Sequence, residues 1–192
     1  SFHPVKAITT GEGGAVTCKN PDDAINIQAL RSHGLIYDAG QTSGYVQTML
    51  GYNYRLCDVQ CALGVSQLAK LPGFIAQRAK LAAIYTEQLA GLAPTLSTPV
   101  MLGSGQSGWH LYAVRLHNRD AVRQELQQRG IGSQVHYQPV QTQPYYVERY
   151  GNLSLPGAEQ YGAATLSLPL HPQLVEDDIL VVCGILEEVL HG

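Results

Sequence analysis

A single lysine near the start of the chain stands in an apolar, hydroxyl-rich segment, SFHPVKAITTGEGG. Lys6 is flanked by Val5 and Ala7, and we expect it to lie near the end of a strand. Partial removal from water would disfavour its ammonium form and leave the amine as a nucleophile suited to Schiff-base chemistry. The hydroxyl of Ser1 is suited to holding an anion such as a phosphate. The alternative is a β-hairpin whose lysine points to solvent, as most lysines do.

Two further segments carry polar and aromatic side chains. The segment GYNYRL places the carboxamide of Asn53 and the guanidinium of Arg55 close together in a predicted loop. His136 and Tyr137 end a predicted strand, which is a common position for binding groups in open sheets. Solvated surface is the alternative for the loop, and a structural role is the alternative for the histidine.

The cysteines are spaced like reduced thiols. Cys18, Cys57, Cys61 and Cys183 form no C-x-x-C pair and no disulfide framework, so we expect a cytoplasmic protein. Cys57 and Cys61 lie one helical turn apart, but no histidine pair accompanies them. We therefore predict that they pack as small apolar residues and hold no metal.

The composition is that of a globular enzyme with room for a substantial core. The 192 residues suffice for one good-sized domain or two small ones, with 45% apolar and 14% charged residues. A net charge of −3 offers no basic surface for nucleic acid. No apolar run approaches the roughly 18 residues that span a bilayer. The chain begins without a methionine or a signal-peptide pattern, in what reads as a strand, so we expect a further N-terminal portion.

The first half of the chain has clear start and stop signals for helices. Asn20 followed by Pro21 is typical of a helix cap and first helical residue. Pro72 is predicted to end one helix before another begins. The other predictions are a strand over 13–20, a helix end at Gly34, a helix start at Asp58 and a long amphipathic helix over 74–92.

A stretch rich in proline, glycine and serine over 91–108 marks the predicted domain boundary. The second half then alternates strands and helices, which describes an α+β lobe with helices on one sheet face. In order, we predict a strand over 109–116, a helix closing at Gly130, a strand over 131–137, a loop over 138–151, a helix over 156–164, a strand over 164–170 and a helix over 176–190.

The opening segment, SFHPVKAITTGEGGAV, resembles the cofactor-lysine segment of the DegT/DnrJ/EryC1 family of sugar aminotransferases, which depend on pyridoxal 5'-phosphate (PLP). The resemblance implies that Lys6 is the catalytic lysine and forms the Schiff base, and that Ser1 binds the cofactor phosphate. The segment GYNYRL is similar to one that crosses the dimer interface in this family. By that likeness Asn53 reaches the cofactor phosphate of the partner subunit, which implies a homodimer with shared sites.

A third segment, VHYQPVQTQPYY, resembles the part of the family's small domain that lines the sugar-nucleotide site. It implies that His136, Tyr137 and Tyr145 bind substrate, and we place Arg55 with them. Among the branches of the family, the sequences of these segments are most similar to the transaminases of pseudaminic-acid biosynthesis. That branch implies transfer of an amino group from L-glutamate to C4 of a UDP-linked 4-keto-6-deoxy-N-acetylhexosamine.

The resemblance also implies the fold and its limits. The implied fold class is α/β, that of PLP transferases of fold type I. Residues 1–90 would be the C-terminal part of the large domain, together with the interdomain helix. Residues 91–192 would form a small α+β domain. Complete family members carry, ahead of Ser1, a carboxylate for the pyridine nitrogen and an aromatic that stacks on the ring. This chain would then be a C-terminal half that is inactive alone. His3 either contacts the cofactor or packs, and packing is the favoured interpretation.

Two other functions stay open at this point. The chain would be a catalytically incomplete fragment or a stand-alone dimerisation module that keeps the fold. The segment TTGEGG would be a nucleotide-phosphate loop, although no G-x-x-x-x-G-K-[ST] pattern supports it.

Overall fold

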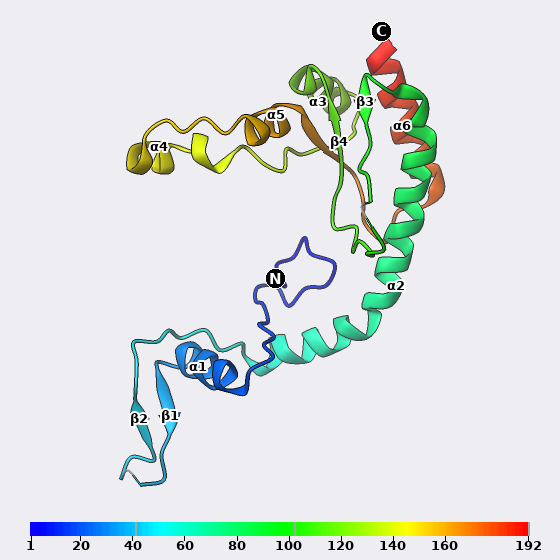
Figure 1. The fold of residues 1–192 in the computed structure, drawn as a ribbon. Helices are drawn as coiled ribbons and strands as arrows, with labels where there is room; N and C mark the ends of the chain where they lie inside the picture. Colours follow the sequence, from blue (N-terminus) through cyan, green and yellow to red (C-terminus); the bar gives the residue numbers. More distant parts are fainter. Residues whose placement is uncertain (41, 102, 192) are drawn as a thin grey trace. The chain divides into compact units, whose positions relative to one another are not determined.

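The protein divides into two compact units, Ser1–Leu71 and Pro72–Gly192. A computed structural model describes residues 1–40, 42–101 and 103–191. Figure 1 shows the elements in chain order. Each unit is described separately below.

Helix α1 (Pro21–Arg31) of the first unit forms as its sequence predicts. The side chain of Asn20 accepts a hydrogen bond of 3.0 Å from the backbone N–H of Asp22, and Pro21 occupies the first turn. The helix ends where the N–H of Gly34 bonds to the carbonyl of Ala29 at 2.8 Å, with a φ of +72° at the glycine. A Cβ at Gly34 would lie 1.7 Å from the carbonyl oxygen of Met49, so only glycine fits there.

A short antiparallel hairpin follows α1. Strand β1 (Leu35–Tyr37) pairs with β2 (Tyr45–Gln47), with Ile36 opposite Val46. The strand predicted over 13–20 is wrong, since no described residue before Leu35 belongs to a strand. Residues 11–20 are all exposed, and this stretch has no partner strand to complete a ladder.

Helix α2 (Asp58–Gln88) is continuous, so the break predicted at Pro72 is wrong. The predicted start at Asp58 is confirmed. A proline inside a helix removes one backbone donor and would ordinarily kink or end it. Here the turns after the proline are held by packing, because the side chains of Leu81 and Tyr85 are completely buried.

The second unit is built on a three-stranded antiparallel sheet in the order β3-β4-β5 (Figure 1). Leu96 pairs with Leu116, and Val114 pairs with Leu166. Helix α3 contacts α6 and β5, and α5 contacts β4. The elements are η1 (Leu89–Leu92), β3 (Leu96–Ser97), β4 (Tyr112–Leu116), α3 (Arg119–Gln128), η2 (Val140–Thr142), α4 (Pro144–Tyr150), α5 (Pro156–Ala164), β5 (Thr165–Leu168) and α6 (Glu176–His191).

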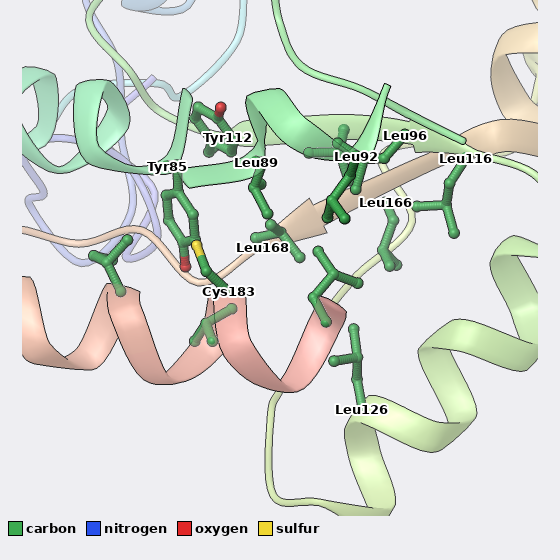
Figure 2. Close-up of a cluster of buried hydrophobic side chains, with 14 of the residues drawn as sticks. Tyr85, Leu89, Leu92, Leu96, Tyr112, Leu116, Leu126, Leu166, Leu168 and Cys183 are labelled. Carbon is green, nitrogen blue, oxygen red and sulfur yellow. The ribbon is translucent and has the colours of Figure 1, made fainter. Parts of the chain in front are cut away.

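The hydrophobic core of this unit lies where α2, α6 and one face of the sheet meet. Figure 2 shows Tyr85 of α2 beside Cys183 of α6, with Leu168 of β5 close by. The rings of Tyr85 and Tyr112 stack with centroids 4.7 Å apart. Their hydroxyls bond to the carbonyl of Pro169 and to the hydroxyl of Thr86, each at 2.9 Å, so neither buried phenol lacks a partner.

Two predictions for the second unit are corrected. Residues 131–137 form no named strand; Gln134 makes only an isolated antiparallel bridge to Ser167. The predicted loop over 138–151 contains η2 and α4. The predicted helices over 156–164 and 176–190 are confirmed, apart from one residue at the end of α6.

The division of the chain falls before Pro72, ahead of the domain boundary predicted in the stretch over 91–108. The second half of α2 packs into the core of the second unit, so its contacts group it there. The assignment of 1–90 and 91–192 to the large and small domains of a whole enzyme stays a prediction.

Candidate functional site

The segment that carries Lys6 is a closed loop, so the strand end predicted there is wrong and the alternative hairpin does not form either. We call residues 1–14 the Lys6 loop. The N–H of Phe2 donates to the carbonyl of Gly13 at 2.8 Å, and the N–H of Thr10 donates to the carbonyl of Phe2 at 3.0 Å. The hydroxyl of Thr9 reaches the same carbonyl at 2.8 Å. These bonds join the two ends of the loop and hold the residues between them in turns and bends.

Lys6 is half-buried at the bend of this loop. Its backbone N–H donates to the carbonyl of His3 at 2.9 Å. Ser1 is exposed, and its hydroxyl oxygen accepts a 3.4 Å contact from the N–H of His3. His3 is also exposed, and its Nε2 lies 3.6 Å from the carboxylate of Glu12. The expectation that His3 packs is therefore wrong.

The beginning of α2 anchors the Lys6 loop. The side-chain amide of Gln60 donates to the carbonyls of Glu12 at 3.0 Å and Thr10 at 3.4 Å. A Cβ at Gly13 would lie 2.8 Å from Cδ2 of Leu56, so the loop and the segment before α2 are in close contact. The sequence signals did not single out Gln60, because a glutamine on a helix carries no sign of which carbonyls it will reach.

Asn53 and Arg55 lie in an extended segment beside the end of α1. The N–H of Tyr52 donates to the carbonyl of Leu30 at 2.7 Å, and Asn53 bridges to Ser32. The side chains of Asn53 and Arg55 are exposed, as predicted for a polar loop.

A hollow of ≈ 800 Å³ adjoins this segment. Arg55 lines it together with Arg31 and the stacked rings of Tyr52 and Tyr54, whose centroids are 4.8 Å apart. Lys6 and Asn53 do not line it. The hollow is thus a neighbouring feature of the first unit and not the lysine site itself.

The predicted substrate-side residues belong to the second unit. Nδ1 of His136 lies 2.9 Å from the hydroxyl of Ser167, and the ring of Tyr137 meets the imidazole edge-on at a centroid distance of 4.7 Å. Tyr137 is 67% exposed. Tyr145 lies on α4, is 62% exposed and accepts a 3.3 Å hydrogen bond from Arg149. Two exposed phenols and a half-buried imidazole are therefore available to a ligand.

The first unit has very little core of its own. Its buried apolar residues, in the part that the structure describes, are Ile8 and Ala29. By contrast, Val59, Val65 and Leu68 on α2 are 79%, 73% and 59% exposed. A helix that is apolar on more than one side is typical of a buried helix. This surface is therefore suited to packing against further polypeptide.

The prediction that Cys57 and Cys61 pack as small apolar residues is wrong. Cys57 and Cys61 are exposed, and only Cys183 is buried. In the described ranges, no three His, Cys, Asp or Glu side chains gather as a metal site would require. Within the same ranges, no helix combines the length and apolar character needed to cross a membrane.

Comparison with known proteins places this geometry among aminotransferases. The model of the DegT/DnrJ/EryC1/StrS aminotransferase family matches residues 1–187. The UDP-4-amino-4,6-dideoxy-N-acetyl-beta-L-altrosamine transaminase of Campylobacter jejuni is 38% identical over 201 residues, covering 100% of this chain and 53% of the relative. The predicted family is confirmed.

Solved structures similar to this chain are also aminotransferases. Helicobacter pylori PseC, an aminotransferase involved in pseudaminic acid biosynthesis, matches with a TM-score of 0.91 and 30% identity, over 100% of this chain and 52% of that one. Spr1654 from Streptococcus pneumoniae, solved in a PLP form, matches with a TM-score of 0.86 and 25% identity over 100% of this chain and 50% of that one. The predicted α/β fold class is thereby confirmed. The chain spans about half the length of the relatives that it matches.

Proposed function

Because the chain belongs to the DegT/DnrJ/EryC1/StrS aminotransferase family, we propose that it is the C-terminal half of a nucleotide-sugar aminotransferase. The proposed reaction moves an amino group from L-glutamate to C4 of a UDP-linked 4-keto-6-deoxy sugar. Aminotransferases of this family are PLP-dependent, and solved relatives include PLP and PMP forms. The observation that carries the proposal is the closed loop, fixed by hydrogen bonds, on which both Lys6 and Ser1 lie.

The chemistry of the loop fits this cofactor. PLP needs an amine that can bond to its aldehyde carbon and donors that can hold its phosphate. Lys6 supplies an amine at a backbone bend fixed by hydrogen bonds, and Ser1 supplies an exposed hydroxyl on the same loop. The anchoring bonds from Gln60 hold this loop against α2, so the two groups are carried by one ordered segment.

When bound, PLP supplies an aldehyde that captures amino groups and a ring that withdraws electrons from the reacting carbon. Nζ of Lys6 would hold the cofactor covalently and would move the transferred proton as a general base. The hydroxyl of Ser1 binds a phosphate oxygen. The exposed carboxamide of Asn53 binds the cofactor phosphate of the partner subunit, which requires a homodimer.

The substrate side of the proposal uses His136, Tyr137, Tyr145 and Arg55. Exposed aromatic rings provide faces for the apolar parts of a nucleotide sugar, and a guanidinium provides a paired donor for phosphate. A UDP-linked sugar is supported by the name of the C. jejuni relative, which is a transaminase of a UDP-linked amino sugar.

The exposed apolar surface of the first unit supports two proposed partners. One is the further N-terminal portion, which would bring the carboxylate and the aromatic that complete the cofactor site; without it this chain would be inactive. The other is the second subunit of the homodimer. The same surface also favours the alternative function, an interaction module without catalysis.

Free thiols at Cys18, Cys57 and Cys61 support a reducing compartment, the cytoplasm.

The test uses the purified protein together with its N-terminal portion. We expect visible absorbance after addition of PLP, loss of that absorbance in Lys6→Ala, and formation of 2-oxoglutarate from L-glutamate. Lys19→Ala is the matched control, since Lys19 is an exposed lysine and plays no part in the proposal. A protein that forms dimers, takes up no PLP and makes no 2-oxoglutarate would support the interaction module and refute the enzyme.

A further inference from the structure

Ser167 lies at a fixed point of the sheet in the second unit. On one side Ser167 pairs with Ala113 of β4. On the other side its N–H and carbonyl exchange hydrogen bonds of 2.8 and 3.2 Å with the backbone of Gln134. The side chain is on the opposite face from the core residues Leu166 and Leu168, because successive residues of a strand alternate. Ser167 is only 4% exposed.

The hydroxyl of Ser167 reaches Nδ1 of His136 at 2.9 Å. His136 comes two residues after Gln134, so the pair are diagonal neighbours across the bridge. The imidazole is also bounded by the ring of Tyr137, which meets it edge-on at an interplanar angle of 83°. The backbone of Ser167 is paired on both sides, whereas His136 lies beyond the bridge residue Gln134.

We propose that Ser167 is a positioning residue that sets the orientation of His136 for binding the nucleotide sugar. This inference rests on the proposed function, which assigns His136 to the substrate. A hydroxyl can donate or accept, so it bonds to Nδ1 in either tautomer, and the bond at Nδ1 fixes the direction in which Nε2 points. Any contact that Nε2 makes with a substrate inherits the orientation that Ser167 imposes.

A neighbouring residue shows that the position alone does not create such a contact. Thr165 lies two residues earlier on β5 and is completely buried. Its Oγ1 has no hydrogen-bond partner among the described residues. Of these two hydroxyls on one strand face, that of Ser167 bonds to an imidazole and that of Thr165 does not. Thr165→Val is therefore a matched control, since it removes a hydroxyl and keeps the shape of the side chain.

The experiment compares Ser167→Ala, Ser167→Cys and Thr165→Val in the holoenzyme. The ring nitrogens of His136 are observed by NMR of protein labelled with ¹⁵N-histidine, and the kinetic constants are measured with the nucleotide sugar. For Ser167→Ala we expect altered ¹⁵N shifts at His136 and a KM about five- to tenfold higher, with kcat changed less than about twofold. Ser167→Cys should lie between wild type and Ser167→Ala, because a thiol bonds more weakly. Thr165→Val should match wild type in both measurements.

Two outcomes would overturn the inference, and they are distinguishable from failure of the proposed function. Unchanged His136 shifts in Ser167→Ala would show that the hydroxyl does not set the ring. A KM that is raised by His136→Ala but not by Ser167→Ala would show that orientation by Ser167 is not needed. If His136→Ala itself leaves KM unchanged, the assignment of His136 to the substrate fails, and the positioning role fails with it.

Discussion

Arg78 is a buried cation that joins two segments of the second unit, one at Trp109 and His110 and the other at Leu170. It is 4% exposed, and its Nη1 donates to the carbonyls of Leu170 at 2.8 Å, Trp109 at 3.1 Å and His110 at 3.3 Å. No ion pair in the described part of the chain includes it. Burial lowers the pKa of Arg78 below its usual value. The side chain therefore acts as a hydrogen-bond donor to backbone and not as half of a salt bridge.

Arg78→Met keeps most of the apolar stem and removes the donor. Nη1 carries two hydrogens, so it makes two good bonds at a time, each worth about 1.5–3 kcal/mol for a charged donor. The loss is offset in part, because the variant no longer buries a charge. We expect the free energy of unfolding to fall by about 3 kcal/mol, the lower end of the summed range.

Urea unfolding followed by the fluorescence of Trp109 measures this change. Trp109 is the only tryptophan of the chain, and its own carbonyl accepts one of the bonds. Arg115→Met is the control, because Arg115 is exposed on β4 and its loss should change stability by less than about 0.5 kcal/mol. If the two variants are equally stable, the three carbonyl bonds contribute nothing and the reasoning is refuted.

Two further predictions concern a glycine and alkaline pH. Gly34→Ala should destabilise the first unit strongly, since its Cβ would lie 1.7 Å from the carbonyl oxygen of Met49. Gly130 also has a positive φ but no neighbour to clash with, so Gly130→Ala should lower the free energy of unfolding by only about 1–2 kcal/mol. Equal midpoints of thermal unfolding for the two variants would contradict this. Burial raises the pKa of Cys183 from 9.0 to about 11 and that of Tyr112 from 10.0 to about 12. Since the folded state holds these protons more tightly, their contribution to stability is complete below pH 9 and is lost as pH rises to about 12. Urea unfolding from pH 8 to 12 should therefore show falling stability, with a smaller fall in Cys183→Ala; a flat profile would contradict the prediction.

The helices with local signals were predictable from sequence. The cap at Asn20 and the proline at Pro156 fix the starts of α1 and α5 through bonds and angles that the neighbouring residues supply. Residues 13–20 and 131–137 have strand-like patterns, but a strand also needs a partner, and no local pattern reveals one. Pro72 failed as a stop signal because distant packing of Tyr85 outweighs one lost hydrogen bond.

In the candidate site, too, the sequence reveals some residues and not others. The motifs single out Lys6, Ser1 and Asn53 as candidates, because chemistry limits which residue types serve, and their roles stay predictions. The residues that hold these groups were not found. The contacts of Gln60 with Glu12 and Thr10, and of Ser167 with His136, exist only in the folded chain and have no signal in the sequence.

The most direct test of the central claim is to locate the covalent cofactor. The protein with its N-terminal portion is loaded with PLP, reduced with borohydride, digested and analysed by mass spectrometry. The account predicts a phosphopyridoxyl group on Lys6 and none on Lys19, Lys70 or Lys80, which are exposed lysines of the same chain. Stoichiometric labelling of another lysine with Lys6 unmodified would contradict it.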